Sequence, residues 1–384
     1  TKDMISFSEV YFNKAIKTTK TRLLKDDPGL TAYSLSDEKT FDITIGDRVL
    51  SEEIVSGGRV PVYSANVYEE FGRIDKENMK DYSRPSVIWG IDGDWMVNII
   101  PAGVPFYPTD HCGVLRIKTE KILPEYMMYA LQAEGEYERF SRNNRASAQR
   151  IRSLVVQAPE TKIQKNIIDE LKALDDKING QNAEIEKYEN SIRTKFDQIF
   201  HLEEFISDGV FSKYEGYSVE DLCIDGRGRV INQQYIENHK GPYPVYSSQT
   251  TNDGIFGSID TFDFDGEYIT WTTDGAKAGT VFYRNGKFNC TNVCGTLKAK
   301  NDKVNMRYLA YLLNRIAYKF VSRVGNNKLM NDAMKKIVVP VPKRQLQDEF
   351  ADFVQSVEKS KFECIGKKEK FEIEKDTFVH KYFR

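Results

Sequence analysis

Two stretches of the chain combine basic side chains with paired asparagines and contain no acidic residue: 139–159 and 315–331. Arginine and lysine bind phosphates, arginine also pairs with guanine, and an asparagine amide can form two hydrogen bonds with adenine. The candidate contact residues are Arg139, Arg142, Asn143, Asn144, Arg145, Arg150 and Arg152 in the first stretch, and Arg323, Asn326, Asn327 and Lys328 in the second. A solvated surface explains one such stretch, but the recurrence favours contact with nucleic acid.

The recurrence is part of a longer duplication. Pro-Val-Tyr-Ser occurs at residues 61–64 and again at 244–247. Other segments return in the same order, namely Phe71–Asp75 as Phe256–Asp260, Thr109–Arg116 as Thr291–Lys298, and Tyr126–Leu131 as Tyr308–Leu313. The offset stays within 182–185 residues. A repeat of about 180 residues is too long for a solenoid and has the size of a domain with an appendage.

Each repeat changes its hydrophobic period along its length. The first part is rich in Tyr, Phe, Thr and Gly, with short alternating runs such as 267–272 and 280–284, which predict a curved, turn-rich sheet. Short helical stretches follow around 124–140 and 306–322. The sequence therefore predicts an α+β fold for each of two similar domains.

Two long helices are predicted at the ends of the repeats. Their apolar positions, spaced by threes, fours and sevens, include Leu171, Leu174, Ile178, Ile185 and Ile192 in the first and Phe350, Phe353, Val357, Phe371 and Phe378 in the second. One such stripe is most often a surface helix on its own domain. Two helices of about 60 Å each are longer than a compact domain, so mutual pairing as an antiparallel coiled-coil spacer is favoured. The predicted parts are 1–160, 161–200, 201–343 and 344–384.

Composition narrows the class of protein. Apolar and charged fractions are those of a globular chain, and no apolar run reaches the roughly 18 residues of a membrane helix. We expect a cytoplasmic protein without a membrane partner. The five cysteines have no paired spacing, so reduced, buried thiols are expected, especially at Cys112 and Cys294. The four histidines have no metal-ligand spacing, and no metal site is expected.

The repeated order of domain and long helix resembles the specificity subunits of type I restriction-modification systems. The segments that carry the resemblance are Ile269–Gly275, Gly279–Tyr283, Asn289–Gly295 and Ile337–Pro342, the last leading into a helix that contains glutamine. The likeness runs from about Tyr33 to the C-terminus. It is strongest in the second half, because Gly90–Gly93 lacks the paired threonines of the second copy.

The resemblance implies a subunit without chemistry of its own that reads two DNA half-sites separated by a fixed gap. It implies two target-recognition domains, with Thr272, Thr273 and Lys277 added to the candidate DNA contacts. The implied partners are double-stranded DNA, two adenine-methylating modification subunits and restriction or translocase subunits. S-adenosylmethionine, ATP and Mg are then expected only on those partners. The sequence has no Walker motif and no Asn/Asp-Pro-Pro-aromatic tetrapeptide, which independently indicates a non-catalytic chain.

Two alternatives remain open at the level of the sequence. The chain begins with Thr rather than Met, so it could be the specificity half of a single-chain methyltransferase-nuclease. It could also be a coiled-coil scaffold that binds only proteins. An in-frame catalytic region upstream would support the first alternative, and salt-dependent DNA binding would exclude the second.

Overall fold

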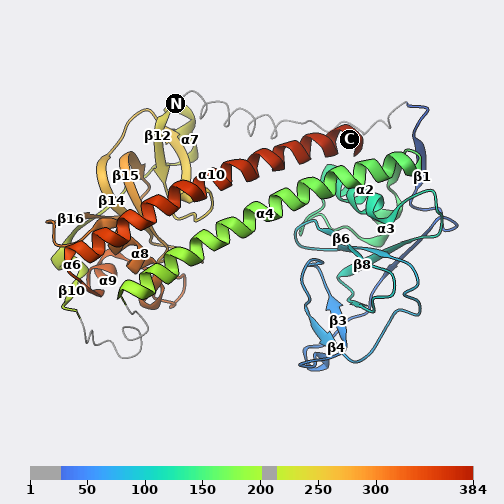
Figure 1. The fold of residues 1–384 in the computed structure, drawn as a ribbon, viewed down its shortest axis with the longest axis horizontal. Coiled ribbons are helices and arrows are strands. Elements are labelled where there is room, and N and C mark those ends of the chain that lie inside the picture. The colour runs from blue at the N-terminus through green and yellow to red at the C-terminus, as the bar shows by residue number, and fades with distance from the viewer. Residues whose placement is uncertain (1–26, 201–213, 384) are drawn as a thin grey trace. The chain divides into compact units, whose positions relative to one another are not determined.

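The computed structural model describes residues 27–200 and 214–383. The chain divides into two compact units, here called unit 1 (Thr1–Gly180 with Lys368–Arg384) and unit 2 (Gln181–Lys367). Each unit contains β-sheets, short helices and its own parts of two long helices (Figure 1), so the predicted α+β class is confirmed. The predicted first and second domains begin at residues 1 and 201. Their opening segments, 1–26 and 201–213, lie outside the described residues.

Unit 1 is built from short strands followed by two short helices. Its strands are β1 (Thr31–Ser34), β2 (Phe41–Ile45), β3 (Val60–Tyr63), β4 (Gly72–Ile74), β5 (Ser86–Gly90), β6 (Val97–Ile100), β7 (Tyr107–Pro108), β8 (Cys112–Ile117) and β9 (Val155–Ala158). Its helices are η1 (Ser51–Glu53), α2 (Pro124–Tyr137), α3 (Ala148–Arg152) and the first half of α4 (Thr161–Phe200). The sheets have the strand orders β2-β8-β5-β6, β4-β3-β7 and β1-β9.

Unit 2 repeats this plan with longer strands. Its strands are β10 (Gly216–Ser218), β11 (Cys223–Arg227), β12 (Lys240–Tyr246), β13 (Ile255–Ile259), β14 (Phe264–Thr272), β15 (Val281–Cys290), β16 (Cys294–Ala299) and β17 (Val338–Pro340). Its helices are α6 (Val219–Leu222), α7 (Gln233–Asn238), η2 (Asn252–Gly254), α8 (Met306–Ile316), η3 (Ala317–Phe320), α9 (Asn331–Lys335) and most of α10 (Arg344–Phe383). The sheets have the orders β11-β16-β14-β15-β12-β13 and β10-β17.

The repeated Pro-Val-Tyr-Ser segments form equivalent strands, β3 and β12. Each pairs antiparallel with the next strand and parallel with a later one, β7 or β15. The valines Val62 and Val245 are completely buried. The serine hydroxyl of each copy bonds an equivalent threonine, Ser64 to Thr109 at 3.1 Å and Ser247 to Thr291 at 2.9 Å. The duplicated sequence therefore marks a duplicated joint between sheet segments.

The two units differ where one long strand of unit 2 is replaced by two short strands of unit 1. In unit 2, β15 pairs with both β14 and β12 and holds six strands in one sheet. In unit 1, β6 and β7 take these places separately, and Pro101 and Pro105 lie between them. Proline has no backbone N–H to continue a ladder of hydrogen bonds, which explains the division into two sheets.

A tryptophan occupies the centre of each core. Trp89 donates its indole N–H to the carbonyl of Ala146 at 2.8 Å, and Trp271 donates to Leu329 at 2.9 Å. A Cβ atom added to the glycine after Cys112 or Cys294 would lie 2.1 or 2.2 Å from the tryptophan ring, so only glycine fits there. All five cysteines are free and buried, as expected from their spacing.

The long helices α4 and α10 pack antiparallel within each unit. In unit 1 the start of α4 shares a core with the end of α10, and the ammonium of Lys177 on α4 lies 5.4 Å from the ring centre of Phe371 on α10. In unit 2 the end of α4 meets the start of α10, with the ring centres of Phe196 and Phe350 5.0 Å apart. The predicted stripe residues are buried or half-buried on these helices: Leu171, Leu174, Ile178, Ile185, Ile192, Phe350, Phe353, Val357, Phe371 and Phe378. The predicted pairing of the helices is confirmed in each unit.

Ion pairs accompany the apolar contacts between the helices. Asp175 pairs with Lys375 in unit 1, and Lys195 pairs with Glu349 at 2.8 Å in unit 2. The division into units falls beside two glycines in the helix interiors, Gly180 and Gly366, and a Cβ added to either would meet no atom within 4 Å. Across residues 27–200 and 214–383, no helix combines the length and apolar character needed to span a bilayer.

Candidate nucleic-acid interface

A tight hairpin presents the centre of the first basic stretch. Ser141 and Asn144 exchange two backbone hydrogen bonds of 3.0 Å each. This closure places Arg142 and Asn143 at the tip, and both residues are exposed. The predicted contact residues Arg142 and Asn143 therefore lie where a double helix could reach them.

Other residues of the same stretch hold the hairpin in place. The Asn144 amide donates to the carbonyls of Glu138 at 2.9 Å and Arg139 at 3.0 Å. The Arg150 guanidinium donates to the Asn144 side-chain oxygen at 2.6 Å and lies 4.5 Å from the Phe140 ring centre. These hydrogen bonds let Asn144 and Arg150 support the hairpin. The Arg150 side chain remains 38 % exposed, and direct contact of Asn144 and Arg150 with DNA stays a prediction.

Two further predicted contacts are shaped by local structure. Arg152 is half-buried and donates to the carbonyl of Ile43 on β2, so its guanidinium ties α3 to the sheet, and its contact with DNA stays a prediction. Arg139 is exposed and has a backbone φ of 59°. A positive φ is uncommon outside glycine, and here it ends α2 so that the hairpin can follow.

Arg145 is held at the surface by an acidic neighbour. Its guanidinium lies 3.7 Å from the carboxylate of Asp92, and its side chain remains 68 % exposed. The same carboxylate lies 3.0 Å from Nδ1 of His111. Asp92 therefore restrains Arg145 at the position that the sequence predicted to face a ligand.

Unit 2 carries a larger hairpin at the equivalent place. Ser322 and Lys328 exchange backbone hydrogen bonds of 2.8 and 3.0 Å and enclose five residues. Gly325, with a φ of 75°, turns the loop, and Val324 at its tip is 92 % exposed. The exposed residues of this loop are Arg323, Val324, Gly325 and Asn326. An apolar side chain this exposed next to Arg323 could contact the methyl group of thymine in a major groove.

The second hairpin is anchored as the first is. The Lys328 ammonium lies 3.7 Å from the carboxylate of Asp274. The carbonyl of Asn327 accepts a 3.1 Å hydrogen bond from the backbone N–H of Gly275. The pair of Lys328 with Asp274 thus repeats the pair of Arg145 with Asp92, in agreement with the sequence duplication.

The two predicted threonines do not reach the surface. Thr272 and Thr273 are completely buried, so their prediction as DNA contacts is corrected. The hydroxyl of Thr272 donates to the carbonyl of Lys277 at 2.6 Å, and that of Thr273 lies 3.3 Å from the carboxylate of Asp274. Paired hydroxyls fix the loop that carries Lys277, and Lys277 itself is exposed.

Unit 2 has a further loop, residues 252–254, that the sequence analysis did not single out. Asn252, Asp253 and Gly254 follow one another with φ values of 50°, 51° and 76°, a conformation that costs energy in the first two. The buried Arg284 guanidinium donates to the Asp253 carboxylate and lies 3.7 Å from the Tyr246 ring centre. Burial is the main cause that raises the pKa of Tyr246, so this tyrosine is neutral at physiological pH. The Asn-Asp-Gly turn was the available signal, because these residues tolerate positive φ.

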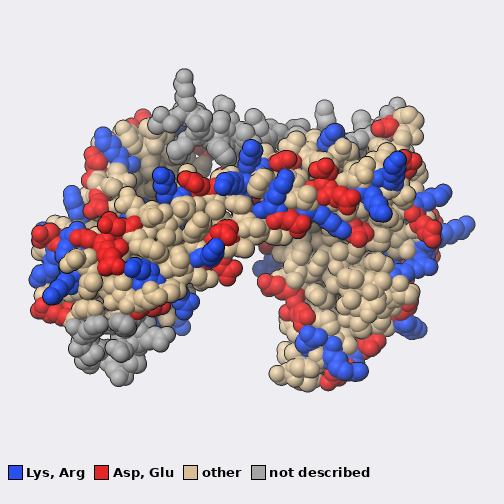
Figure 2. Space-filling model, in the orientation of Figure 1, with Lys and Arg blue, Asp and Glu red and all other residues tan. Residues whose placement is uncertain are grey.

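Charge is mixed over the surface in view. Figure 2 shows Lys and Arg interspersed with Asp and Glu rather than gathered in one patch. The net charge of −2 agrees with this mixture. Within the described residues no group of three His, Cys, Asp or Glu side chains has the arrangement of a metal site.

The chain is similar to several specificity subunits of Mycoplasma pneumoniae (strain ATCC 29342 / M129 / Subtype 1). It is 39 % identical over 212 residues to the putative type I specificity subunit S.MpnORF365P, covering 55 % of this chain and 77 % of that protein. It is 48 % identical over 147 residues to the specificity subunit of the type I restriction enzyme MpnII, covering 38 % of this chain and 44 % of that one. These relatives do not favour a methyltransferase-nuclease or a scaffold.

A solved structure and a family model cover both units. The crystal structure of the S subunit of the type I restriction-modification system from M. genitalium superposes with a TM-score of 0.60 at 18 % identity, over 94 % of this chain and 98 % of that one, which shows the shared fold. The model of the type I restriction modification DNA specificity domain matches residues 40–187 and 212–375, more than half of the chain. The chain therefore belongs to the family of type I restriction modification DNA specificity domains, of which it carries two.

Proposed function

We propose that the chain recognises a bipartite sequence in double-stranded DNA, with each unit reading one half-site. The observation that carries this proposal is the pair of equivalent hairpins, each on its own unit. Each hairpin has an exposed arginine at or beside its tip, Arg142 or Arg323, and a basic residue paired with an aspartate. Phosphate contacts by the basic residues would set the register of each unit on the duplex, while tip residues would read base edges.

The long helices would serve as a spacer between the half-sites. Each unit contains an antiparallel part of the α4 and α10 pair with its own apolar core and ion pairs. A helix pair resists bending far more than a flexible linker does, so it would hold the gap between the half-sites to one preferred length.

The chain would act through partner subunits and carry out no reaction itself. Its relatives are named as type I specificity subunits, one of them that of a restriction enzyme. By that likeness the partners are two adenine-methylating modification subunits and restriction or translocase subunits. S-adenosylmethionine, ATP and Mg would bind to those partners. The partner subunits could bind the exposed surface of the long helices, for example on α10, where Phe362 is 77 % exposed.

The proposed function is tested by sequencing. Genomic methylation is mapped by long-read sequencing in the host with the gene and in a strain without it. We expect one two-part motif with an adenine modified in each half to disappear with the gene. In parallel, the purified chain is used to select duplexes from a randomised library. Selection of a motif without a gap, or of none, would contradict the proposal.

A further inference from the structure

A buried glutamine links each long helix to a shorter helix of its own unit, α4 to α2 in unit 1 and α10 to α8 in unit 2. Gln164 lies in the first turns of α4 and is completely buried. Its side-chain oxygen accepts a hydrogen bond from the backbone N–H of Leu123 at 2.8 Å. Its amide donates to the carbonyls of Lys121 at 2.8 Å and Pro159 at 2.7 Å. Leu123 is the residue that precedes α2, so one side chain joins the starts of two helices.

Unit 2 has the same arrangement at Gln347 of α10, which is also completely buried. Its oxygen accepts from the backbone N–H of Asn305 at 2.7 Å. Its amide donates to the carbonyls of Lys303 at 3.2 Å and Pro342 at 2.8 Å. Asn305 precedes α8 as Leu123 precedes α2. Each set of three hydrogen bonds is here called the glutamine link of its unit.

Only a primary amide on a long side chain satisfies such a site. It must accept from one N–H and donate to two carbonyls at once, whereas a carboxylate offers no donor and an ammonium no acceptor. All three partners are backbone atoms. In each link the bond to the proline carbonyl is buried and the other two are partly buried, so unpaired groups there would be unfavourable. The link therefore fixes the direction in which the long helix leaves the unit.

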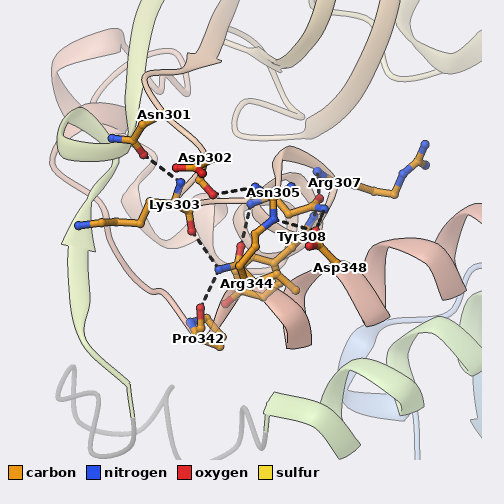
Figure 3. A network of polar contacts seen from close by, with 10 residues as sticks. Asn301, Asp302, Lys303, Asn305, Arg307, Tyr308, Pro342, Arg344 and Asp348 are labelled. Carbon is orange, nitrogen blue, oxygen red and sulfur yellow. Dashed lines mark hydrogen bonds and ion pairs between the residues drawn. The ribbon is translucent and has the colours of Figure 1, made fainter.

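The link of unit 2 is reinforced by a further network, shown in Figure 3. The Asn305 side chain accepts from the backbone of Arg307 at 2.9 Å and donates to Asp348 at 2.7 Å. Arg344 donates to the same carboxylate at 2.7 Å and to the carbonyl of Asp302 at 2.7 Å. In unit 1 the residue before α2 is Leu123, which has no side-chain cap. Gln164 thus carries the connection with fewer supporting contacts.

We propose that Gln164 and Gln347 are positioning residues that set how strictly the chain selects the gap between its half-sites. The inference rests on the proposed function, in which each unit reads one half-site. A tilt of about 5° would displace the far end of a 40-residue helix, about 60 Å long, by about 5 Å. That displacement corresponds to between one and two base pairs, at about 3.4 Å each. A loosened link would therefore admit several gaps without changing the bases that are read.

The first test compares gap selection in variants of the full chain. Gln164→Met and Gln347→Met retain side-chain volume and remove all three hydrogen bonds. Ile168→Ala and Val354→Ala remove buried apolar contacts from the same helices and control for lost stability. The chain is offered duplexes with the half-sites selected by the parent and gaps up to three base pairs shorter or longer.

We expect the parent and the apolar controls to prefer one gap by at least tenfold. Each glutamine variant should reduce that preference to about threefold or less while retaining its base preference within each half-site. An unchanged gap preference in the glutamine variants would overturn the inference. So would apolar control variants that have the same loss of Tm and accept an equally broad range of gaps. If the parent selects no two-part site, the proposed function fails. The second test still shows whether the glutamine link restrains the long helix.

The second test needs no DNA. Spin labels are placed at Glu120→Cys and Asp176→Cys, two exposed positions of unit 1, while the five native cysteines are buried. The width of the distance distribution should about double in Gln164→Met. If that variant does not fold, Gln164→Glu replaces it, because it retains the acceptor for Leu123 and loses both donors. An unchanged width in a folded variant would overturn the inference.

Discussion

Lys328 and Asp274 lie 3.7 Å apart, and the pair recurs in the other unit as Arg145 with Asp92, also at 3.7 Å. In each pair the basic side chain is at least half exposed, at 50 % for Lys328 and 68 % for Arg145. A surface pair of this kind contributes little to stability. We propose that the pair holds the cation in one place, where a DNA phosphate would replace the carboxylate or share the cation with it.

Lys328 and Asp274 should affect DNA binding in opposite directions. Lys328→Ala removes a phosphate partner and should lower the slope of binding against salt by about one, or cost about 1–3 kcal/mol if it contacts a base. Asp274→Asn removes a competing negative charge and should tighten binding at low salt. Titrations at several salt concentrations measure both effects. Equal affinity of both variants and the parent would show that this pair lies away from DNA.

In the first hairpin, substitution of Arg142 should mainly affect DNA binding, and substitution of Arg150 should mainly affect stability. Arg150→Ala breaks hydrogen bonds to Asn144 and to the Arg145 carbonyl, and we expect it to lower the free energy of unfolding by about 1–2 kcal/mol. Arg142→Ala changes an exposed tip and should alter stability by less than about 0.5 kcal/mol while weakening DNA binding. Urea unfolding and binding titrations are measured on both variants. The reverse pattern would contradict this division of roles.

Val324 should influence which base pair unit 2 accepts. Val324→Ser removes both methyl groups and leaves a small hydroxyl side chain at the tip. Because the side chain is 92 % exposed, stability should stay within about 0.5 kcal/mol of the parent. Loss of an apolar contact with a thymine methyl group should cost about 1 kcal/mol at one position of one half-site. Selection from a randomised library shows whether one position changes, and no change would place the tip outside the groove.

The two recognition domains should be exchangeable. Residues 33–160 or 217–343 are replaced by the equivalent segment of a related specificity subunit. On the domain side, the glutamine links use only the backbone atoms of residues 121, 123, 159, 303, 305 and 342, which any sequence with the same backbone provides. Methylation sequencing should show a new half-site on one side only. A hybrid that alters both half-sites, or neither, would contradict modular reading.

The spacer should lengthen only when both helices are extended. The contacts between α4 and α10 are antiparallel in each unit, so four residues inserted after Gly180 need four more after Gly366. Four residues add about 6 Å of helix and nearly preserve the apolar face. The preferred gap should grow by one or two base pairs, at about 3.4 Å each. An insertion in α4 alone should impair the pairing, and an unchanged gap in the double insertion would exclude the helices as the spacer.

The sequence alone determined the duplication, the α+β class and the two long helices. These features follow from local patterns: residues repeated at a constant offset, alternating apolar residues in the strands, and stripes spaced by threes and fours. It also located the two basic stretches that form the hairpins, because basic residues beside paired asparagines are recognisable without coordinates. Even the glutamines were visible as a matched pair after matched prolines, although nothing in the sequence said what their amides contact.

Only the tertiary structure decided which side chains of these stretches are available. Arg150 and Arg142 are alike in sequence, yet one donates into its own hairpin and the other lies at an exposed tip. Thr272 and Thr273 belong to the segment that most resembles the family, and they are buried. Burial and hydrogen-bond partners depend on segments distant along the chain, such as β2 for Arg152 and the residue before α2 for Gln164. A local pattern cannot supply that information, because the partners meet only when the sheets and helices pack.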